Sequence, residues 1–400
     1  MLTALLAALL ALSCGGCATY EAFVDSISAE EEAENVIKIG VFEPLSGSDE
    51  EAAAWEIRGI ELAHELWPTV LGKELVLVYE DNRSDLEMAE KAANALVEEG
   101  VSVVLGSYSN VLSLAGRDIF QEAKIPSVAI TNTNPLVTLG SEYSLRVCFV
   151  DSFQGEAAAR YVYQDLGLEN AAVLKLEADD YGAAMAQSFR EELSLLTGNE
   201  EAVDRVTEYE AGTEDFTVQL EIFESSGIEL VYMPVKAQDA AIIMAQAREM
   251  GSSLIFLGTR LWEDEDLASL AGEAAEGAVF TSLFDTETAT TGMAEVFLNA
   301  YREKYGDDTA GQEAAALGFD AYLLVVQAIR ESGGASDGET LLGALMNIQG
   351  FEGATGSITL DENGDPVRTV VIKTVREGAY VFEDTADPTE TEELPEETGE

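Results

Sequence analysis

Basic residues are the scarcest feature of this 400-residue chain, in which 21 lysines and arginines stand against 76 aspartates and glutamates, for a formal net charge of −55. A protein that grips a phosphate backbone needs a basic surface, so nucleic acid is excluded as a partner. Histidine occurs only once, as His64, without an HExxH partner. Hydrolase chemistry therefore lacks its usual base, and we expect neither catalytic residues nor an enzyme.

Cysteine is also scarce, at positions 14, 17 and 148. Three cysteines provide neither a disulfide framework nor a zinc site, and no GxGxxG or Walker A sequence follows an apolar run. The stretch from Asp361 resembles a calcium loop, but Pro366 stands where that loop requires glycine, so a hairpin turn around residues 363–364 is predicted instead. We therefore expect no metal and no cofactor. Cys148, within the apolar run SLRVCFV, is predicted to be a core residue.

The N-terminus, MLTALLAALLALSCGGC, contains an apolar run that is too short to span a bilayer and ends in small residues and cysteine. It is typical of a secretory segment with a lipoprotein-type processing site, although the usual basic start is missing. Cleavage before Cys14 would leave its thiol to carry lipid, with Cys17 as the alternative, and residues 1–35 would comprise the leader and an acidic tether. An apolar N-terminus without processing is the simpler alternative.

Acidic residues are concentrated at both ends but are not confined to them. Residues 20–34 and 384–400 together carry 14 acids and no base, which leaves a net charge of about −41 for the remainder. We expect residues 384–400 to form a disordered acidic tail. The acidic surface should keep the protein dispersed as a monomer, and a salty habitat would screen its self-repulsion.

Short apolar runs alternate with helical patterns along the rest of the chain, which predicts an α/β protein with parallel sheets. The helical stretch 86–97 places its apolar residues on one stripe and stops at Gly100. The series restarts near residue 171, so we expect two doubly wound lobes. The predicted strands are 36–42, 74–79, 102–106 and 127–130 in the first series, and 171–176, 203–209, 229–233 and 254–258 in the second.

Ligands of open parallel sheets bind beyond the carboxyl ends of the strands, so the segments that follow the strands are the candidates for function. In the first lobe these segments are EPLSG (43–47), SYSN (107–110) and TNTNPL (131–136). In the second lobe they are EADDYG (177–182), PVKAQD (234–239) and TRLWED (259–264).

An ordered set of short motifs, including IKIGVFEPLSG, GSYSN, TNPLVT, RVCFVDSFQG, DDYG, QAREMG and GFDAYLLV, resembles the leucine/isoleucine/valine-binding family of extracellular solute-binding proteins of ABC transporters. The resemblance spans residues 36–380 and implies a type I periplasmic-binding-protein fold, with two lobes joined by a three-crossing hinge that closes on a small ligand. The crossings should fall near 150–152, 281–285 and 361–367. Lobe 1 would then comprise 36–150 plus 285–361, and lobe 2 would comprise 151–284 plus 362–383.

The resemblance also implies a set of ligand-binding residues. Ser109 and Asn110 occupy the segment that offers hydroxyl and N–H groups to a ligand carboxylate at a helix start, with Asn110 at the usual serine position. Thr133 matches the threonine of the TNP motif, with Asn132 beside it, and Tyr181 matches a tyrosine that reaches across from the second lobe. Turn chemistry and lobe packing without ligand contact remain the alternatives.

Two positions depart from the family pattern. Arg260 stands where relatives carry an acid that accepts the ammonium of an amino acid, and Lys236 lies in a segment that often carries an aromatic. A cation about 4 Å from a ligand ammonium costs on the order of 4 kcal/mol at an effective dielectric of 20, so Arg260 and Lys236 favour a second anionic or polar group on the ligand. Alternatively, Arg260 pairs with nearby acids such as Asp179, Asp180 or Glu263, and the pocket is neutral.

The sequence therefore predicts a lipid-anchored solute-binding protein on the outer face of the cell membrane, or in the periplasm. It would present a small amino acid, carboxylate or amide to the membrane subunits of an ABC permease. The alternative is an extracellular receptor component that senses such a ligand without feeding a transporter.

Overall fold

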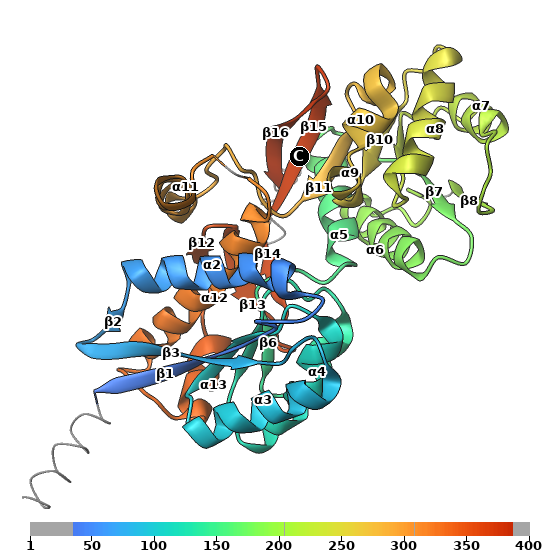
Figure 1. Cartoon of the computed structure of the whole chain (residues 1–400). Coiled ribbons are helices and arrows are strands. Elements are labelled where there is room, and N and C mark those ends of the chain that lie inside the picture. Colours follow the sequence, from blue (N-terminus) through green and yellow to red (C-terminus); the bar gives the residue numbers. More distant parts are fainter. Residues whose placement is uncertain (1–34, 204, 308, 387–400) are drawn as a thin grey trace, which may run out of the picture.

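The computed structural model describes residues 35–386 except 204 and 308, and these residues form two α/β lobes joined by a narrow waist (Figure 1). Cys14, Cys17 and most of the acidic tail expected over residues 384–400 lie outside this part of the chain. Residues 384–386, expected in that tail, instead end a strand that spans Ala379–Ala386. None of the helices in the described ranges combines the length and apolar character needed to cross a membrane.

Lobe 1 is built on a six-stranded sheet in the order β2-β3-β1-β4-β5-β6, parallel throughout except for the antiparallel β2–β3 pair. Its strands are β1 (Val36–Glu43), β2 (Thr69–Val70), β3 (Lys73–Asp81), β4 (Val103–Gly106), β5 (Ser127–Ala129) and β6 (Ser144–Arg146). The accompanying helices are α2 (Glu50–Leu66), α3 (Leu86–Glu99), α4 (Asn110–Glu122), the short η1 (Pro135–Val137), α11 (Gly292–Tyr305), α12 (Gln312–Glu331) and α13 (Gly338–Met346).

Lobe 2 is built on a seven-stranded sheet in the order β16-β15-β11-β10-β9-β7-β8. Its strands are β7 (Ala172–Leu176), β8 (Arg205–Tyr209), β9 (Leu230–Tyr232), β10 (Ile255–Gly258), β11 (Val279–Ser282), β15 (Val370–Arg376) and β16 (Ala379–Ala386). Its helices are α5 (Phe153–Arg160), η2 (Tyr161–Asp165), α6 (Asp180–Thr197), α7 (Thr217–Ser225), α8 (Ala237–Glu249), α9 (Leu261–Asp264), α10 (Leu267–Ala271) and η3 (Gly272–Ala275).

The parallel parts of the two sheets share one topology, because in each the first strand of the series lies between the second and the third. The predicted class of two doubly wound parallel-sheet lobes is confirmed. The β15–β16 hairpin extends the second sheet in the antiparallel sense, a feature that the apolar runs alone did not predict. The predicted end of α3 is also confirmed, since Gly100 takes the left-handed conformation with φ 71° that ends a helix without steric cost.

The third crossing between the lobes lies later in the chain than expected. A third sheet joins β12 (Phe351–Gly353), β13 (Gly356–Leu360) and β14 (Pro366–Arg368), so the chain makes the predicted hairpin turn around residues 363–364. Gly364 O accepts a hydrogen bond from Arg146 N at the end of the first sheet, at 3.0 Å. Residues 362–368, expected in lobe 2, therefore lie with lobe 1, and the chain enters the second sheet at Val370.

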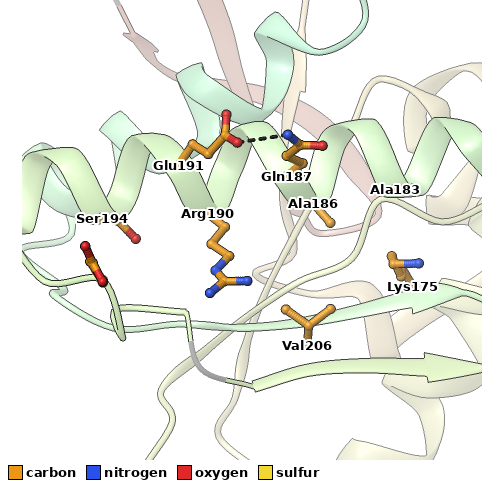
Figure 2. A pocket seen from close by; sticks show the side chains of 9 residues that line it. Lys175, Ala183, Ala186, Gln187, Arg190, Glu191, Ser194 and Val206 are labelled. Atoms are coloured by element: carbon orange, nitrogen blue, oxygen red, sulfur yellow. Dashed lines mark hydrogen bonds between the residues drawn. The ribbon is translucent and has the colours of Figure 1, made fainter.

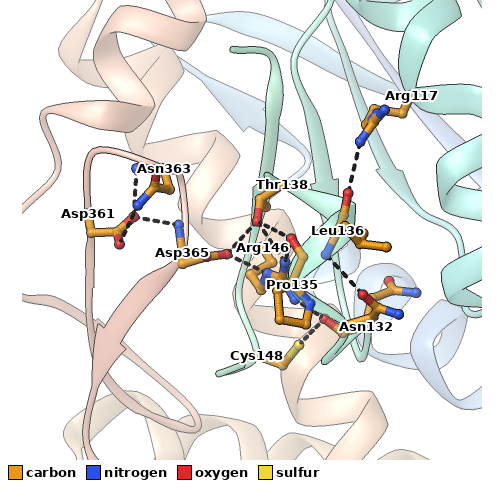
Figure 3. Close-up of polar contacts among 11 residues, drawn as sticks. Arg117, Asn132, Pro135, Leu136, Thr138, Arg146, Cys148, Asp361, Asn363 and Asp365 are labelled. Carbon is orange, nitrogen blue, oxygen red and sulfur yellow. Dashed lines mark hydrogen bonds and ion pairs between the residues drawn. The ribbon is translucent and has the colours of Figure 1, made fainter. Parts of the chain in front are cut away.

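A buried arginine fixes this hairpin to lobe 1 (Figure 3). Arg146 is fully buried, and its Nε lies 2.6 Å from Asp365 Oδ1. Its two terminal nitrogens donate to Asn132 O and to the Thr138 hydroxyl, each at 2.7 Å. Thr138 in turn donates to Asp365 at 2.7 Å, so the ion pair is satisfied by further hydrogen bonds, as a buried pair must be. This cluster holds the segment after β5, which leads to the candidate site.

Candidate ligand-binding cleft

A cleft of about 430 Å³ lies between the two lobes. Lobe 1 supplies most of its wall from the segments that precede α2 and follow β4 and β5, together with the start of α12. Lobe 2 contributes Arg260, at the end of β10. The lining residues are Asp49, Tyr108, Ser109, Asn110, Val111, Thr131, Arg260, Glu313 and Ala314. The cleft thus lies beyond the carboxyl ends of parallel strands, where ligands of such sheets bind.

Ser109 and Asn110 form the start of α4 on the lobe 1 side of the cleft. Ser109 is the N-cap residue, with extended backbone angles (φ −90°, ψ 133°), and its hydroxyl makes no capping hydrogen bond within the described residues. The first N–H groups of a helix have no partner within the helix and carry a partial positive charge. The wall formed by Ser109 and Asn110 can therefore accept an anionic group.

Asn132 and Thr133 do not line this cleft. Asn132 is 1% exposed, and its Nδ2 donates to Tyr108 O at 3.2 Å, which ties the segment after β5 to the segment after β4. Thr133 hydrogen-bonds the carboxyl of Asp151, in the first crossing between the lobes. Asn132 therefore lies behind the wall and joins two of its segments, whereas Thr133 is partly exposed and interacts with the first crossing between the lobes.

Tyr181 and Lys236 line a smaller cavity of about 240 Å³ in lobe 2, beside the cleft. The Tyr181 hydroxyl donates to Thr259 Oγ1 at 3.0 Å, and burial raises the pKa of Tyr181 to about 12. Lys236 is the exposed N-cap residue of α8. Arg260 and Asp151 both act electrostatically on Tyr181. The charge of Arg260 also acts on Asp151, between the lobes.

Arg260 forms an ion pair that crosses the cleft. Its Nη1 lies 3.2 Å from Glu313 Oε1, at the start of α12 in lobe 1, and the two side chains are 29% and 32% exposed. Its backbone N–H donates to Gln154 Oε1 at 3.3 Å. Glu263, one of the partners considered from the sequence, pairs with Lys373 instead, at 2.6 Å. The acid that faces Arg260 comes from the opposite lobe, which sequence proximity could not reveal.

Two fully buried glutamates behind the lobe 1 wall are a further feature that the sequence analysis missed. Glu43 ends β1, and its Oε2 accepts the N–H of Tyr108 at 2.8 Å. Glu56 lies on the buried face of α2, and its Oε1 accepts the hydroxyl of Thr131. Burial raises the pKa of Glu56 to about 7, and burial beside Glu56 raises that of Glu43 well above its usual range. The sequence did contain a signal for these two residues, because Glu43 ends an otherwise apolar strand and Glu56 lies on an otherwise apolar helix face.

A larger cavity, of about 660 Å³, lies within lobe 2 between α6 and β8 (Figure 2). Lys175 and Arg190 line it together with Glu191 and Glu200, so it mixes both signs of charge, and the ammonium of Lys175 pairs with Glu208 at 2.5 Å. Hinge closure would not enclose a ligand there, because every lining residue belongs to one lobe. The cleft between the lobes is the better candidate.

Two doubly wound lobes around a cleft that both supply form the arrangement of a protein that binds a small ligand between its lobes. The sequence profile of the periplasmic binding protein family matches residues 36–379, and the chain belongs to this family. Its family membership also supports a location outside the cytoplasm.

Known relatives cover most of the chain. Leu/Ile/Val-binding protein homolog 2 of Brucella abortus is 26% identical over 336 residues, which cover 82% of this chain and 87% of that protein. The crystal structure of the leucine-binding protein LivK from Thermotoga maritima has 34% identity and a TM-score of 0.62. The match covers 88% of this chain and 99% of the LivK chain. The crystal structure of LivJ from Streptococcus pneumoniae in complex with isoleucine has 28% identity and a TM-score of 0.61. The match covers 88% of this chain and 98% of the LivJ chain.

Proposed function

We propose that this protein is a lipid-anchored, monomeric solute-binding component of an ABC importer that captures a small amino-acid-like or carboxylate-bearing solute by hinge closure. The main support for this proposal is that the start of α4 in lobe 1 and Arg260 in lobe 2 line the same cleft. Relatives named for leucine, isoleucine and valine support an amino-acid-like solute.

The solute's carboxylate would bind at Ser109 and Asn110, where the first N–H groups of α4 are available to it. Arg260 would meet a second polar or anionic group from lobe 2, since a guanidinium suits bidentate recognition of carboxylates. Both contacts form together only when the lobes close, so each stabilises the closed state over the open one.

The ion pair between Arg260 and Glu313 decides between two kinds of solute. A dicarboxylate would have to compete with Glu313 for the guanidinium. An amino acid would direct its ammonium towards the acids of the cleft, Glu313 and Asp49, and leave the ion pair in place. Tyr181, Thr133, Asn132 and Lys236 would support the closed form around these contacts.

The test is a thermal-shift screen of amino acids, dicarboxylates and amides, followed by calorimetric titration of each compound that raises the melting temperature. A ligand that binds only the folded state at a concentration 100 times its Kd stabilises it by about 2.7 kcal/mol, a readily measured shift. We expect a carboxylate-bearing compound to bind, and substitution of Asn110 by leucine to weaken it. Binding that survives both Asn110→Leu and Arg260→Gln unchanged would contradict the proposed site.

The lipid anchor would form at Cys14, or at Cys17. Mass spectrometry of the protein isolated from membranes should show a lipid adduct on the new N-terminal cysteine. Cys14→Ser should release the protein from the membrane fraction if Cys14 is the site, and Cys17→Ser should do so if Cys17 is. Membrane association that persists in the double variant would contradict the anchor.

A further inference from the structure

The second oxygens of the two buried glutamates, Glu43 Oε1 and Glu56 Oε2, accept no N–H or O–H group from another described residue. The two carboxyl groups share one buried site, and the charge of Glu56 acts on Glu43. An ionised carboxylate can only accept a hydrogen bond, so the two carboxyl groups can hydrogen-bond each other only if one of them carries a proton. Two ionised carboxylates in this buried site would repel each other.

Each carboxyl group also holds a different segment of the cleft wall. Glu43 holds the N–H of Tyr108, and Glu56 holds the hydroxyl of Thr131, and both of these residues line the cleft. The pair therefore connects the segments after β4 and β5 to β1 and α2. Gly106 leaves the space that the pair needs, since a Cβ atom at this position would overlap Glu43 Oε1.

We propose that Glu43 and Glu56 share one proton, and that this proton positions the Tyr108 and Thr131 segments of the cleft wall, so that the order of the wall depends on protonation of the pair. The two glutamates are positioning residues, because they reach the cleft through Tyr108 and Thr131. Loss of the shared proton would place two negative charges behind the wall and release these segments. The consequence for solute capture rests on the proposed function, whereas the effect on the wall does not.

Among residues 35–386, neither Glu43 nor Glu56 forms an ion pair with a lysine or arginine. The segment after β4 contributes the N–H of Tyr108, whereas the hydroxyl of Ser107 accepts a hydrogen bond from Asn82 at 2.9 Å. The segment after β6 contributes the thiol of Cys148, whose pKa burial raises to about 12, and which therefore stays neutral beside Glu56.

The charged groups of the adjoining helix are engaged elsewhere. On α12, which packs against α2, Glu313 pairs with Arg260, and Asp320 accepts the N–H groups of Ala354 and Thr355. Because these surroundings neutralise neither carboxyl group, a shared proton is the interaction that can join the two groups.

The direction of the pH effect follows from the two raised pKa values. Both exceed 4.5, the ordinary value for glutamate, so the folded protein holds more protons than the unfolded chain. The stabilising contribution is complete below about pH 4.5 and is lost as the pH rises through 7 and beyond. A process linked to one proton changes by at most about tenfold per pH unit.

The decisive experiment is hydrogen exchange of the Tyr108 amide in the full chain without ligand, from pH 6 to pH 10, corrected for the intrinsic exchange rate. In the unsubstituted protein we expect the protection factor to fall by up to about tenfold per pH unit as the pair loses its shared proton. Glu43→Gln should remove the fall, because the glutamine amide donates to Glu56 without titrating while its oxygen still accepts the Tyr108 N–H. Glu56→Gln provides the same test from the other side.

Asp320→Asn is the matched control, because Asp320 is also fully buried in lobe 1, with a pKa raised to about 6, but does not line the cleft. It should leave the pH profile of the Tyr108 amide as it is in the unsubstituted protein. A flat profile in the unsubstituted protein, an unchanged slope in folded Glu43→Gln and Glu56→Gln, or a profile flattened equally by Asp320→Asn would each overturn the proposal. Calorimetry with L-leucine over the same pH range tests the proposed function separately. If leucine does not bind at any pH, the proposed amino-acid-like solute is contradicted, and the conclusion from hydrogen exchange is unaffected.

Discussion

Removing the guanidinium of Arg260 should separate the two kinds of solute that the cleft can accept. A hydrogen bond to a charged group contributes about 1.5–3 kcal/mol, and 1.4 kcal/mol corresponds to a tenfold change in Kd. Arg260→Gln should therefore weaken binding of a dicarboxylate such as succinate by about 10- to 100-fold. Glu313→Gln should have the opposite effect, because it removes the carboxylate that competes for Arg260 at 3.2 Å.

The size of the gain in Glu313→Gln is limited by solvent. Both side chains are about one-third exposed, so water and salt screen the ion pair, and its net contribution is about 1 kcal/mol or less. The expected gain in dicarboxylate affinity is thus fivefold or less, and it should shrink as salt is added. For an amino acid, the same substitution should weaken binding.

Isothermal titration calorimetry of both variants with the solutes found by thermal shift provides the measurement. Arg160→Gln is the matched control, because Arg160 is also a mostly buried arginine of lobe 2, paired with Glu192 at 2.6 Å, but does not line the cleft. Leucine-like amino acids that bind with micromolar affinity, and that bind equally well to Arg260→Asp, would refute the role of Arg260 in recognising an anionic group.

Three further substitutions or probes test the packing behind the cleft. Gly59→Ala should destabilise the protein by about 1–3 kcal/mol in urea unfolding, because the new methyl group would overlap the backbone of Ala315 where α2 meets α12, and an unchanged midpoint would contradict this close contact. Arg146→Leu should cost about 3 kcal/mol in the same assay, since it leaves Asp365 without its buried partner, and a loss below 1 kcal/mol would argue against a structural ion pair. Cys148 should remain unlabelled by a maleimide at pH 7.5 until the protein is denatured, because burial raises its thiol pKa to about 12, and peptide mapping of rapid labelling would contradict that burial.

Most parallel strands of both lobes were predictable because parallel strands covered on both faces are continuous apolar runs. The run at residues 36–42 became β1, and that at 254–258 became β10. The third crossing was misplaced because Asp361 and Gly364 indicate a turn without showing which sheet receives the next strand. That choice depends on Arg146, more than two hundred residues earlier, which holds Asp365.

The candidate site was only partly predictable for the same reason. Strand ends located Ser109, Asn110 and Arg260, which line one cleft. The partner of Arg260 lies on α12 of the opposite lobe, and no local spacing connects it to the TRLWED segment. Glu43 and Glu56 each interrupt an apolar pattern, but in a chain with 76 acidic residues nothing local shows that these two meet in the interior.

Small-angle X-ray scattering of the full chain, with and without the solute that gives the largest thermal shift, tests most directly the claim that the two lobes close on a small molecule. The account predicts a smaller radius of gyration on saturation, and no such change in a variant that combines Asn110→Leu with Arg260→Gln. A solute that binds stoichiometrically to the unsubstituted protein while the radius of gyration stays constant would contradict it.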